Sequence, residues 1–84
     1  MKITLKLYAM LADYLPEEAR KSNALQLELE TGTTVAACIK DFKLPPKLCH
    51  LVLIDGVFIA PDERARRALV EADTLAIWPP LAGG

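Results

Sequence analysis

The apolar residues of this 84-residue chain change their spacing along the sequence, and this change constrains the fold more than any other feature. Apolar and polar residues alternate in residues 2–8 (KITLKLY) and 25–30 (LQLELE), as in strands with one buried face. Residues 35–42 instead carry an apolar stripe at helical spacing. We therefore predict two antiparallel strands and one main helix that covers their apolar face. The residues expected to face inward are Ile3, Leu5, Leu7, Leu25, Leu27 and Leu29 in the strands and Val35, Cys38, Ile39 and Phe42 in the helix.

Local signals predict where further elements begin and end. Residues 11–15 have helical apolar spacing before a proline, which predicts a short helix after the first strand. Thr33 is the expected N-cap of the main helix, and the double proline at 45–46 prevents that helix from continuing. The pair Asp55-Gly56 predicts a tight turn between two short strands.

The last third of the chain predicts a charged loop and a final strand. Residues 61–73 form the loop, anchored by Leu69, and residues 74–78 (TLAIW) form the strand. The resulting order of elements is that of the β-grasp arrangement found in ubiquitin. We therefore expect an α+β, ubiquitin-like β-grasp domain over residues 1–78, with a mixed sheet of four to five strands and the main helix on one face. Residues 79–84 are expected to form an extended tail.

Composition excludes several classes of function. A net charge of −1 argues against a protein that binds the phosphate backbone of nucleic acids. The apolar run Leu51 to Ile54, like every other apolar run of the sequence, is too short to span a membrane, and the N-terminal stretch does not have the apolar core of a signal peptide. A cytoplasmic protein is therefore expected. Cys38 and Cys49 do not have zinc-site spacing, so we expect two reduced thiols, with a redox or persulfide role as the alternative.

The remaining reactive side chains do not form a catalytic motif. His50 is the only histidine, and adjacent strand residues such as Cys49 and His50 point to opposite faces, which argues against a catalytic pair. No carboxylates have the spacing of metal ligands. A basic cluster in the 61–73 loop is expected to be solvated and balanced by nearby acids, although contact with a nucleotide or an acidic partner is an alternative. The charged residues concerned are Arg64, Arg66, Arg67, Asp62, Glu63 and Glu71.

Three aromatic residues are expected on the face of the sheet that does not carry the helix. The alternation that buries Leu7, Ile59 and Ile77 directs their neighbours Tyr8, Phe58 and Trp78 the other way. Exposed aromatic side chains that gather in one patch indicate a docking surface for a partner. The alternatives are a loop that covers them, or a different strand register.

The sequence closes with PPLAGG, an unusual ending for an apolar-rich domain. Pro79 and Pro80 prevent the last strand from continuing as a paired ladder. Leu81 then offers one apolar side chain. Ala82, Gly83 and Gly84 have so little volume that this segment can enter a channel too narrow for other residues.

Together, these features resemble the ubiquitin-like sulfur carriers of the MoaD/ThiS group, and most of all the small subunit of molybdopterin synthase. The resemblance covers the whole chain and rests on the GTTV helix start, the LVLIDGVFI hairpin and the AIWPPLAGG ending. Trp78-Pro79-Pro80 matches the aromatic and double proline common in the molybdopterin branch. One departure is Ala72, where the family usually has a glycine; alanine there costs about 1 kcal/mol if φ is positive.

The resemblance implies a chemistry centred on Gly84. An activating enzyme would use ATP to adenylate the Gly84 carboxylate, and a persulfide sulfur donor would convert it to a thiocarboxylate. Leu81, Ala82 and Gly83 would thread the tail into the large subunit of molybdopterin synthase, where the sulfur passes to a pterin precursor. Tyr8, Phe58 and Trp78 would dock both partners. The chain itself would bind no cofactor or metal, because the catalytic groups belong to its partners.

Other functions remain open at this stage. A related carrier could supply sulfur for thiamin, cysteine or tRNA thiolation by the same activation. A ubiquitin-like modifier would instead form an amide between Gly84 and lysines of other proteins. A β-grasp interaction module with an inert tail is the third alternative.

Overall fold

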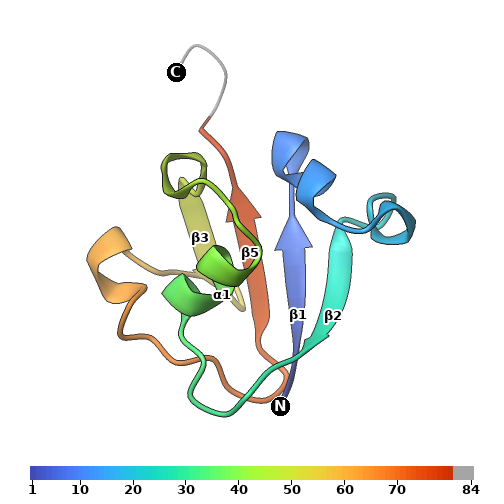
Figure 1. The fold of residues 1–84 in the computed structure, drawn as a ribbon. Helices are drawn as coiled ribbons and strands as arrows, with labels where there is room; N and C mark the ends of the chain where they lie inside the picture. Colours follow the sequence, from blue (N-terminus) through green and yellow to red (C-terminus); the bar gives the residue numbers. More distant parts are fainter. Residues whose placement is uncertain (81–84) are drawn as a thin grey trace.

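A computed structural model shows a five-stranded mixed sheet with one main helix packed against one face (Figure 1). The structure describes residues 1–80. The strand order is β2-β1-β5-β3-β4, with β1 and β5 parallel at the centre and the other pairs antiparallel. This is the predicted β-grasp arrangement. The strands are β1 (Lys2–Leu7), β2 (Ala24–Glu28), β3 (Leu51–Ile54), β4 (Val57–Phe58) and β5 (Thr74–Trp78).

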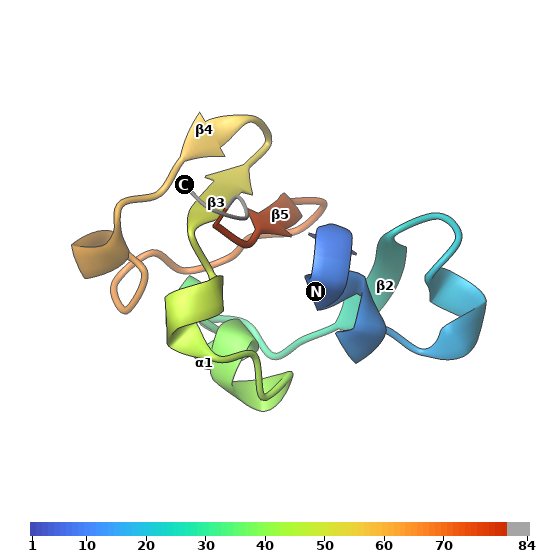
Figure 2. The ribbon, with the colours of Figure 1, turned by 90° about the horizontal axis from the view of Figure 1, so that it is seen from above.

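The register of the strands gathers their apolar residues on one side. Leu5 of β1 lies between Leu25 of β2 and Leu75 of β5. The next inward row joins Leu7, Ile77 and Val52 across β1, β5 and β3. These rows face α1 (Val35–Asp41), whose Val35, Cys38 and Ile39 are buried against them, as predicted from the apolar stripe. Viewed from above, α1 lies to one side of the row of strands (Figure 2).

The start of α1 is one residue later than predicted. The N-cap is Thr34, whose Oγ1 accepts a hydrogen bond from the Ala37 N–H at 3.1 Å. Thr33 instead donates its hydroxyl to the Glu30 carbonyl at 2.7 Å, which closes the preceding turn. Two adjacent threonines are chemically equivalent as caps, so only the backbone geometry of the turn separates them.

Four short 3-10 helices complete the described chain. They are η1 (Ala9–Tyr14), η2 (Glu17–Ala19), η3 (Pro46–Leu48) and η4 (Pro61–Glu63). The short helix predicted around residues 11–15 corresponds to η1, and it packs Leu11 and the following Leu15 into the core. No helix within residues 1–80 is long and apolar enough to cross a membrane.

The tight turn predicted at Asp55-Gly56 joins β3 to β4. Asp55 and Gly56 have φ values of 49° and 84°, the positive pair that characterises a type I′ hairpin turn. The Asp55 carboxylate also accepts a hydrogen bond from the Thr74 N–H at 3.0 Å, and the Asp55 N–H donates to the Thr74 carbonyl at 3.0 Å. The hairpin is thereby fixed to the start of β5.

The segment 61–73 crosses the N-terminal end of α1 and closes the core. Its Leu69 is buried, as predicted. Two N–H groups of the first helical turn have no partner within the helix and donate to this segment instead. Val35 donates to the Arg67 carbonyl at 3.0 Å, and Ala36 donates to the Arg64 carbonyl at 2.8 Å. The segment therefore satisfies helix donors that would otherwise need water or side-chain caps.

The prediction that Arg64 is solvated is wrong. Its side chain is only 9% exposed, and its guanidinium donates to the carbonyls of Ile59 at 3.2 Å, Cys49 at 2.8 Å and His50 at 3.3 Å. A guanidinium has five N–H donors in a rigid, planar arrangement. Here it donates hydrogen bonds to carbonyl groups of the segments that flank the β3–β4 hairpin. The Arg64 side chain can be buried because these three carbonyl oxygens take the place of water as its hydrogen-bond acceptors.

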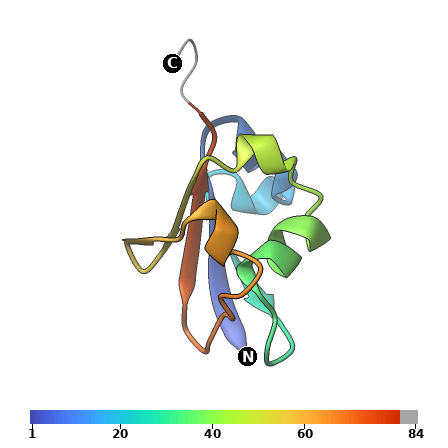
Figure 3. The same cartoon turned by 90° about the vertical axis from the view of Figure 1, so that its left-hand side faces the viewer.

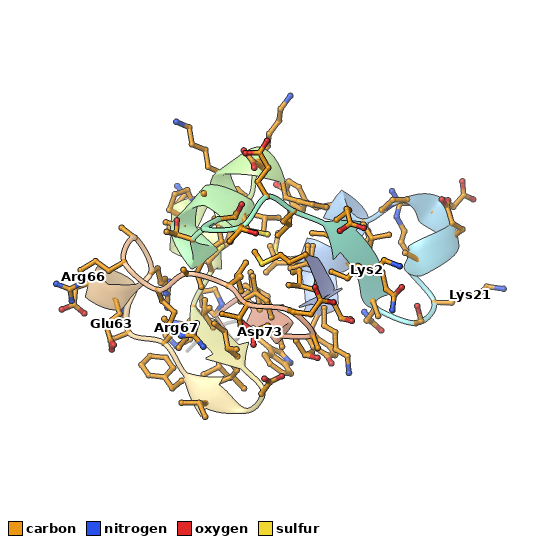
Figure 4. All side chains as sticks on the ribbon, turned by 90° about the horizontal axis from the view of Figure 1, so that it is seen from below. Lys2, Lys21, Glu63, Arg66, Arg67 and Asp73 are labelled. Carbon is orange, nitrogen blue, oxygen red and sulfur yellow. The ribbon has the colours of Figure 1, made fainter. Side chains whose placement is uncertain are left out.

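The other arginines of this segment lie nearer the surface. Arg66 is exposed, as are Asp62 and Glu63. Arg67 is half-buried, and its guanidinium lies 4.0 Å from the Asp73 carboxylate. Figure 4 shows Arg66 and Glu63 at the outer edge of the molecule, with Arg67 nearer to Asp73. The solvated interpretation therefore holds for Arg66 and for the exposed acids Asp62, Glu63 and Glu71.

Candidate functional site

The face of the sheet opposite α1 carries a stacked pair of aromatic rings. The parallel pairing of Leu7 with Ile77 brings Tyr8, the residue after β1, beside Trp78 at the end of β5. The two ring centroids lie 4.1 Å apart, and the ring planes differ by only 4°. The Tyr8 N–H also donates to the Ile77 carbonyl at 3.2 Å, which holds the backbone of both residues together. Both side chains are partly exposed.

Phe58 lies on the same face but at the edge of the sheet. It pairs with Leu53, which in turn pairs with Ala76 of β5, so these three side chains share the outer face. Phe58 is 52% exposed. Trp78 is two residues beyond Ala76, and its partner on β3 is Leu51. Two leucines therefore fill the space between the aromatic residues.

We call this region the outer apolar surface and define it as Tyr8, Leu51, Leu53, Phe58, Ala76 and Trp78. Figure 3 shows the sheet from its edge, with α1 on one side and the β3–β4 hairpin extending to the other. The structure places all three predicted aromatic residues on this surface. Whether they dock a partner stays a prediction.

Sequence reasoning missed Leu51 and Leu53. The run Leu51–Ile54 is apolar throughout, which hides its alternation between two faces. A period of two still applies to it, because Val52 and Ile54 are fully or almost fully buried while Leu51 is 38% exposed. The alternation of the neighbouring strand β5 would have identified both leucines once the pairing was known.

The chain leaves the sheet directly beside the outer apolar surface. The His50 N–H donates to the Trp78 carbonyl at 3.0 Å at the end of β5. Pro79 and Pro80 follow, and neither has an N–H to extend the ladder. The prediction that two prolines end the strand agrees with β5 ending at Trp78. The proposed tail residues Leu81, Ala82, Gly83 and Gly84 lie outside the described residues.

Neither cysteine has the properties of a reactive thiol. Cys38 and Cys49 are both free and buried. Burial raises the pKa of Cys38 to about 11, with a smaller contribution from the charge of Asp41. Burial also raises the pKa of Cys49, although the nearby Arg64 charge acts in the opposite direction. Because the thiolate is the nucleophile, these environments disfavour the alternative redox or persulfide role.

His50 does not join Cys49 in a site. His50 is exposed, whereas the Cys49 side chain is buried and its Sγ lies 3.6 Å from the Pro45 carbonyl oxygen. Across residues 1–80, no three histidine, cysteine or acidic side chains gather in a way that would hold a metal ion. The candidate functional site is therefore the outer apolar surface together with the chain exit.

This fold, with an apolar face beside the point where the chain leaves the sheet, defines a ubiquitin-like β-grasp protein. Two solved structures have the same fold. SAMP1 from Haloferax volcanii has a TM-score of 0.64 and 23% sequence identity, over 100% of both chains. A crystal structure of H. volcanii small archaeal modifier protein 1 has a TM-score of 0.63 and 20% identity, over 95% of this chain and 98% of that one.

The family is established by sequence. The model of the ThiS family matches residues 14–84, so the chain belongs to the ThiS family, a family of ubiquitin-like sulfur carriers. Sulfur carriers of this family generally act with activating enzymes and sulfurtransferases. No curated protein matches the chain significantly.

Proposed function

We propose that this chain is a sulfur carrier whose Gly84 carboxylate is adenylated and converted to a thiocarboxylate, and that it acts as the small subunit of molybdopterin synthase. The observation that carries the first half is the ThiS family match, which extends over the diglycine to residue 84. The second half is supported by Trp78-Pro79-Pro80, the aromatic and double proline that resemble the molybdopterin branch.

The chemistry needs a terminus without bulk. A carboxylate is a poor electrophile, so ATP is used to form an acyl adenylate at Gly84 with release of pyrophosphate. The terminal sulfur of a persulfide then attacks the acyl carbon and displaces AMP. A thiol reduces the resulting acyl disulfide and leaves the thiocarboxylate. Glycine at residues 83 and 84 keeps the acyl carbon open to each of these attacks.

The outer apolar surface has a matching role in this proposal. It lies where the chain leaves the sheet, so a partner that covers Tyr8 and Trp78 binds directly beside the start of the tail. Binding energy from the surface thereby positions the reacting carboxylate. The large subunit of molybdopterin synthase and the activating enzyme would use this surface one after the other.

A second candidate function is a protein modifier joined to lysines through Gly84. It is favoured by the names of the two structural neighbours, both of which are small archaeal modifier proteins. The two functions share the adenylation step and differ in the nucleophile that follows. A carrier releases sulfur, whereas a modifier remains attached by an amide bond.

Intact-mass measurement separates these functions. The protein is incubated with ATP, a cognate activating enzyme and a persulfide donor. We expect a gain equal to one oxygen-for-sulfur exchange, located on the peptide that ends at Gly84. A variant with one alanine added after Gly84 is the control, and it should remain unchanged in mass and retain its stability. High-mass conjugates that survive reducing denaturation would favour the modifier, and sulfur gain in the extended variant would refute the role of Gly84.

A further inference from the structure

A groove lies on the helical side of the sheet, away from the outer apolar surface. It has a volume of about 660 Å³ and runs between α1, η3 and η4, the elements seen together in Figure 3. Most of its lining is apolar, as is typical of sites that bind side chains or small ligands. The apolar contributors include Ile39, Leu44, Pro45, Pro46, Cys49 and Pro61.

All charged groups that line the groove are positive. They are Lys40 in the last turn of α1, Lys43 two residues beyond the end of α1, and Arg64 from the segment after η4. The whole chain carries a net charge of −1, so three cations around one groove are a local concentration of charge. The nearby acids Asp41 and Glu63 do not line it.

The two lysines have charge that the described chain does not neutralise. Both are exposed, and within residues 1–80 no carboxylate lies within 4.0 Å of either ammonium group. Arg64 differs from them, because its guanidinium already donates to three backbone carbonyls. Arg64 therefore forms part of the wall, while Lys40 and Lys43 provide the hydrogen-bond donors that a ligand can use.

We propose that this groove binds an acidic, apolar segment of a partner protein. Leucine-like side chains of the segment contact the exposed Pro46, Pro61 and Ala65, and its carboxylates pair with Lys40 and Lys43. The charge complementarity selects an acidic segment over a neutral or basic one. The apolar lining favours a peptide over a nucleotide. In addition, no glycine of the described chain lines the groove, so no glycine-rich turn brings backbone N–H groups to a phosphate.

The position of the groove allows two partners to bind at once. α1 and the outer apolar surface lie on opposite faces of the sheet, so a segment in the groove leaves Tyr8, Phe58 and Trp78 free. The carrier can therefore be held by one protein while another acts on the tail. This inference does not depend on sulfur transfer, because it rests on the groove alone.

Binding is tested by NMR with a defined probe. The ¹⁵N-labelled full chain is titrated with a short synthetic peptide in which leucine alternates with aspartate. We expect saturable shift changes centred on the amides of Ile39, Lys40, Lys43, Leu44 and Arg64. A peptide in which leucine alternates with lysine should cause no such changes, because it meets the same positive charge.

Charge reversal gives the matched comparison. Lys40→Glu combined with Lys43→Glu should weaken binding of the leucine–aspartate peptide about tenfold, as expected for two exposed ion pairs turned repulsive. Lys2→Glu combined with Lys21→Glu changes the net charge equally, and neither of these lysines lines the groove. Both lie on the other side of the molecule from Arg66, which belongs to the same segment as Arg64 of the groove (Figure 4). This control should bind as the unchanged protein does.

Four results would overturn the proposal. They are absence of binding at millimolar peptide, shifts centred on Tyr8, Phe58 and Trp78, equal weakening by both double variants, and the same shifts on raising protein concentration without peptide. The last result would show that the groove binds a second copy of this chain. The spectra of the variants report whether they remain folded. Thiocarboxylate formation, measured on the Lys40 and Lys43 variant, should be unchanged, so failure here does not bear on the proposed function.

Discussion

Ala72 is an alanine in a backbone conformation that favours glycine. Its φ is 71°, and the Asp73 N–H donates to the Val70 carbonyl at 3.1 Å, so Ala72 is the third residue of a four-residue turn. This is the position at which type II turns require a positive φ. The Ala72 side chain is exposed, so its methyl group contributes little packing. Ala72→Gly should therefore stabilise the protein.

The expected gain follows from two opposing contributions. The left-handed conformation costs an L-residue about 1–2 kcal/mol, and glycine removes this cost. Glycine also gives the unfolded chain more freedom, which lowers stability by about 0.4–1 kcal/mol. The difference is a gain of about 0.5–1 kcal/mol in the free energy of unfolding. For a chain of this size the melting temperature should rise by about 2–8 °C. The Ala72 N–H that donates to the Lys2 carbonyl at 2.7 Å is retained in the variant.

Urea denaturation of two variants isolates the backbone strain. Ala65→Gly is the matched control, because Ala65 is also exposed but is not among the residues with positive φ. It should lose about 0.4–1 kcal/mol. Subtracting one result from the other cancels the freedom that glycine adds to the unfolded chain and leaves the strain at Ala72. If Ala72→Gly is destabilised as much as Ala65→Gly, the turn is not strained and the reasoning is wrong.

Two further predictions concern a buried arginine and the outer apolar surface. Arg64→Met removes the donor from three backbone carbonyls and should lower the free energy of unfolding, measured in urea, by about 3 kcal/mol. The control Arg66→Met, at an exposed arginine, should change this free energy by less than about 0.5 kcal/mol. Equal effects would show that the Arg64 hydrogen bonds contribute nothing to stability. Phe58→Lys and Trp78→Lys should weaken binding to the proposed partner, the large subunit of molybdopterin synthase, at least tenfold when it is measured by calorimetry. Val70→Lys, at an exposed apolar residue outside this surface, should leave the affinity unchanged, and the same affinity for all three would remove the surface from the docking site.

The periodic segments were predictable because their spacing reports a local geometry. Residues 2–8 and 25–30 each have one apolar side, and a period of two leaves few alternatives to a strand. The stripe over residues 35–42 likewise predicted α1, whose bounds are Val35–Asp41. The positive φ at Asp55 and Gly56 confirms the hairpin turn, since few other residue pairs adopt it readily. Boundaries were less certain, and the one-residue error at the helix cap is of this kind.

Burial of Arg64 was not predictable, because its cause is distant in sequence. Its neighbours include an alanine and two more arginines, which is the composition of a solvated loop. The acceptors that bury it are carbonyls of Ile59, Cys49 and His50, five, fifteen and fourteen positions away. Tertiary contacts of this kind leave no local pattern. The groove beside Arg64 was missed for the same reason, since residues from three separate elements form it.

The Tyr8–Trp78 stack lies where the chain leaves the sheet, and several contacts constrain this point. β5 is the central strand that pairs with both β1 and β3, so its end is held from two sides. At that end the Tyr8 N–H binds the Ile77 carbonyl and the His50 N–H binds the Trp78 carbonyl. The stacked rings, 4.1 Å apart, add a contact between side chains at the same point. A partner that recognises this stack thus binds the most constrained part of the sheet, immediately before two prolines with fixed φ. A tail that began at the edge strand β4, with only one neighbour, would begin from a less constrained position. The central position of the last strand therefore fits the proposed role, in which the chain delivers a reactive terminus.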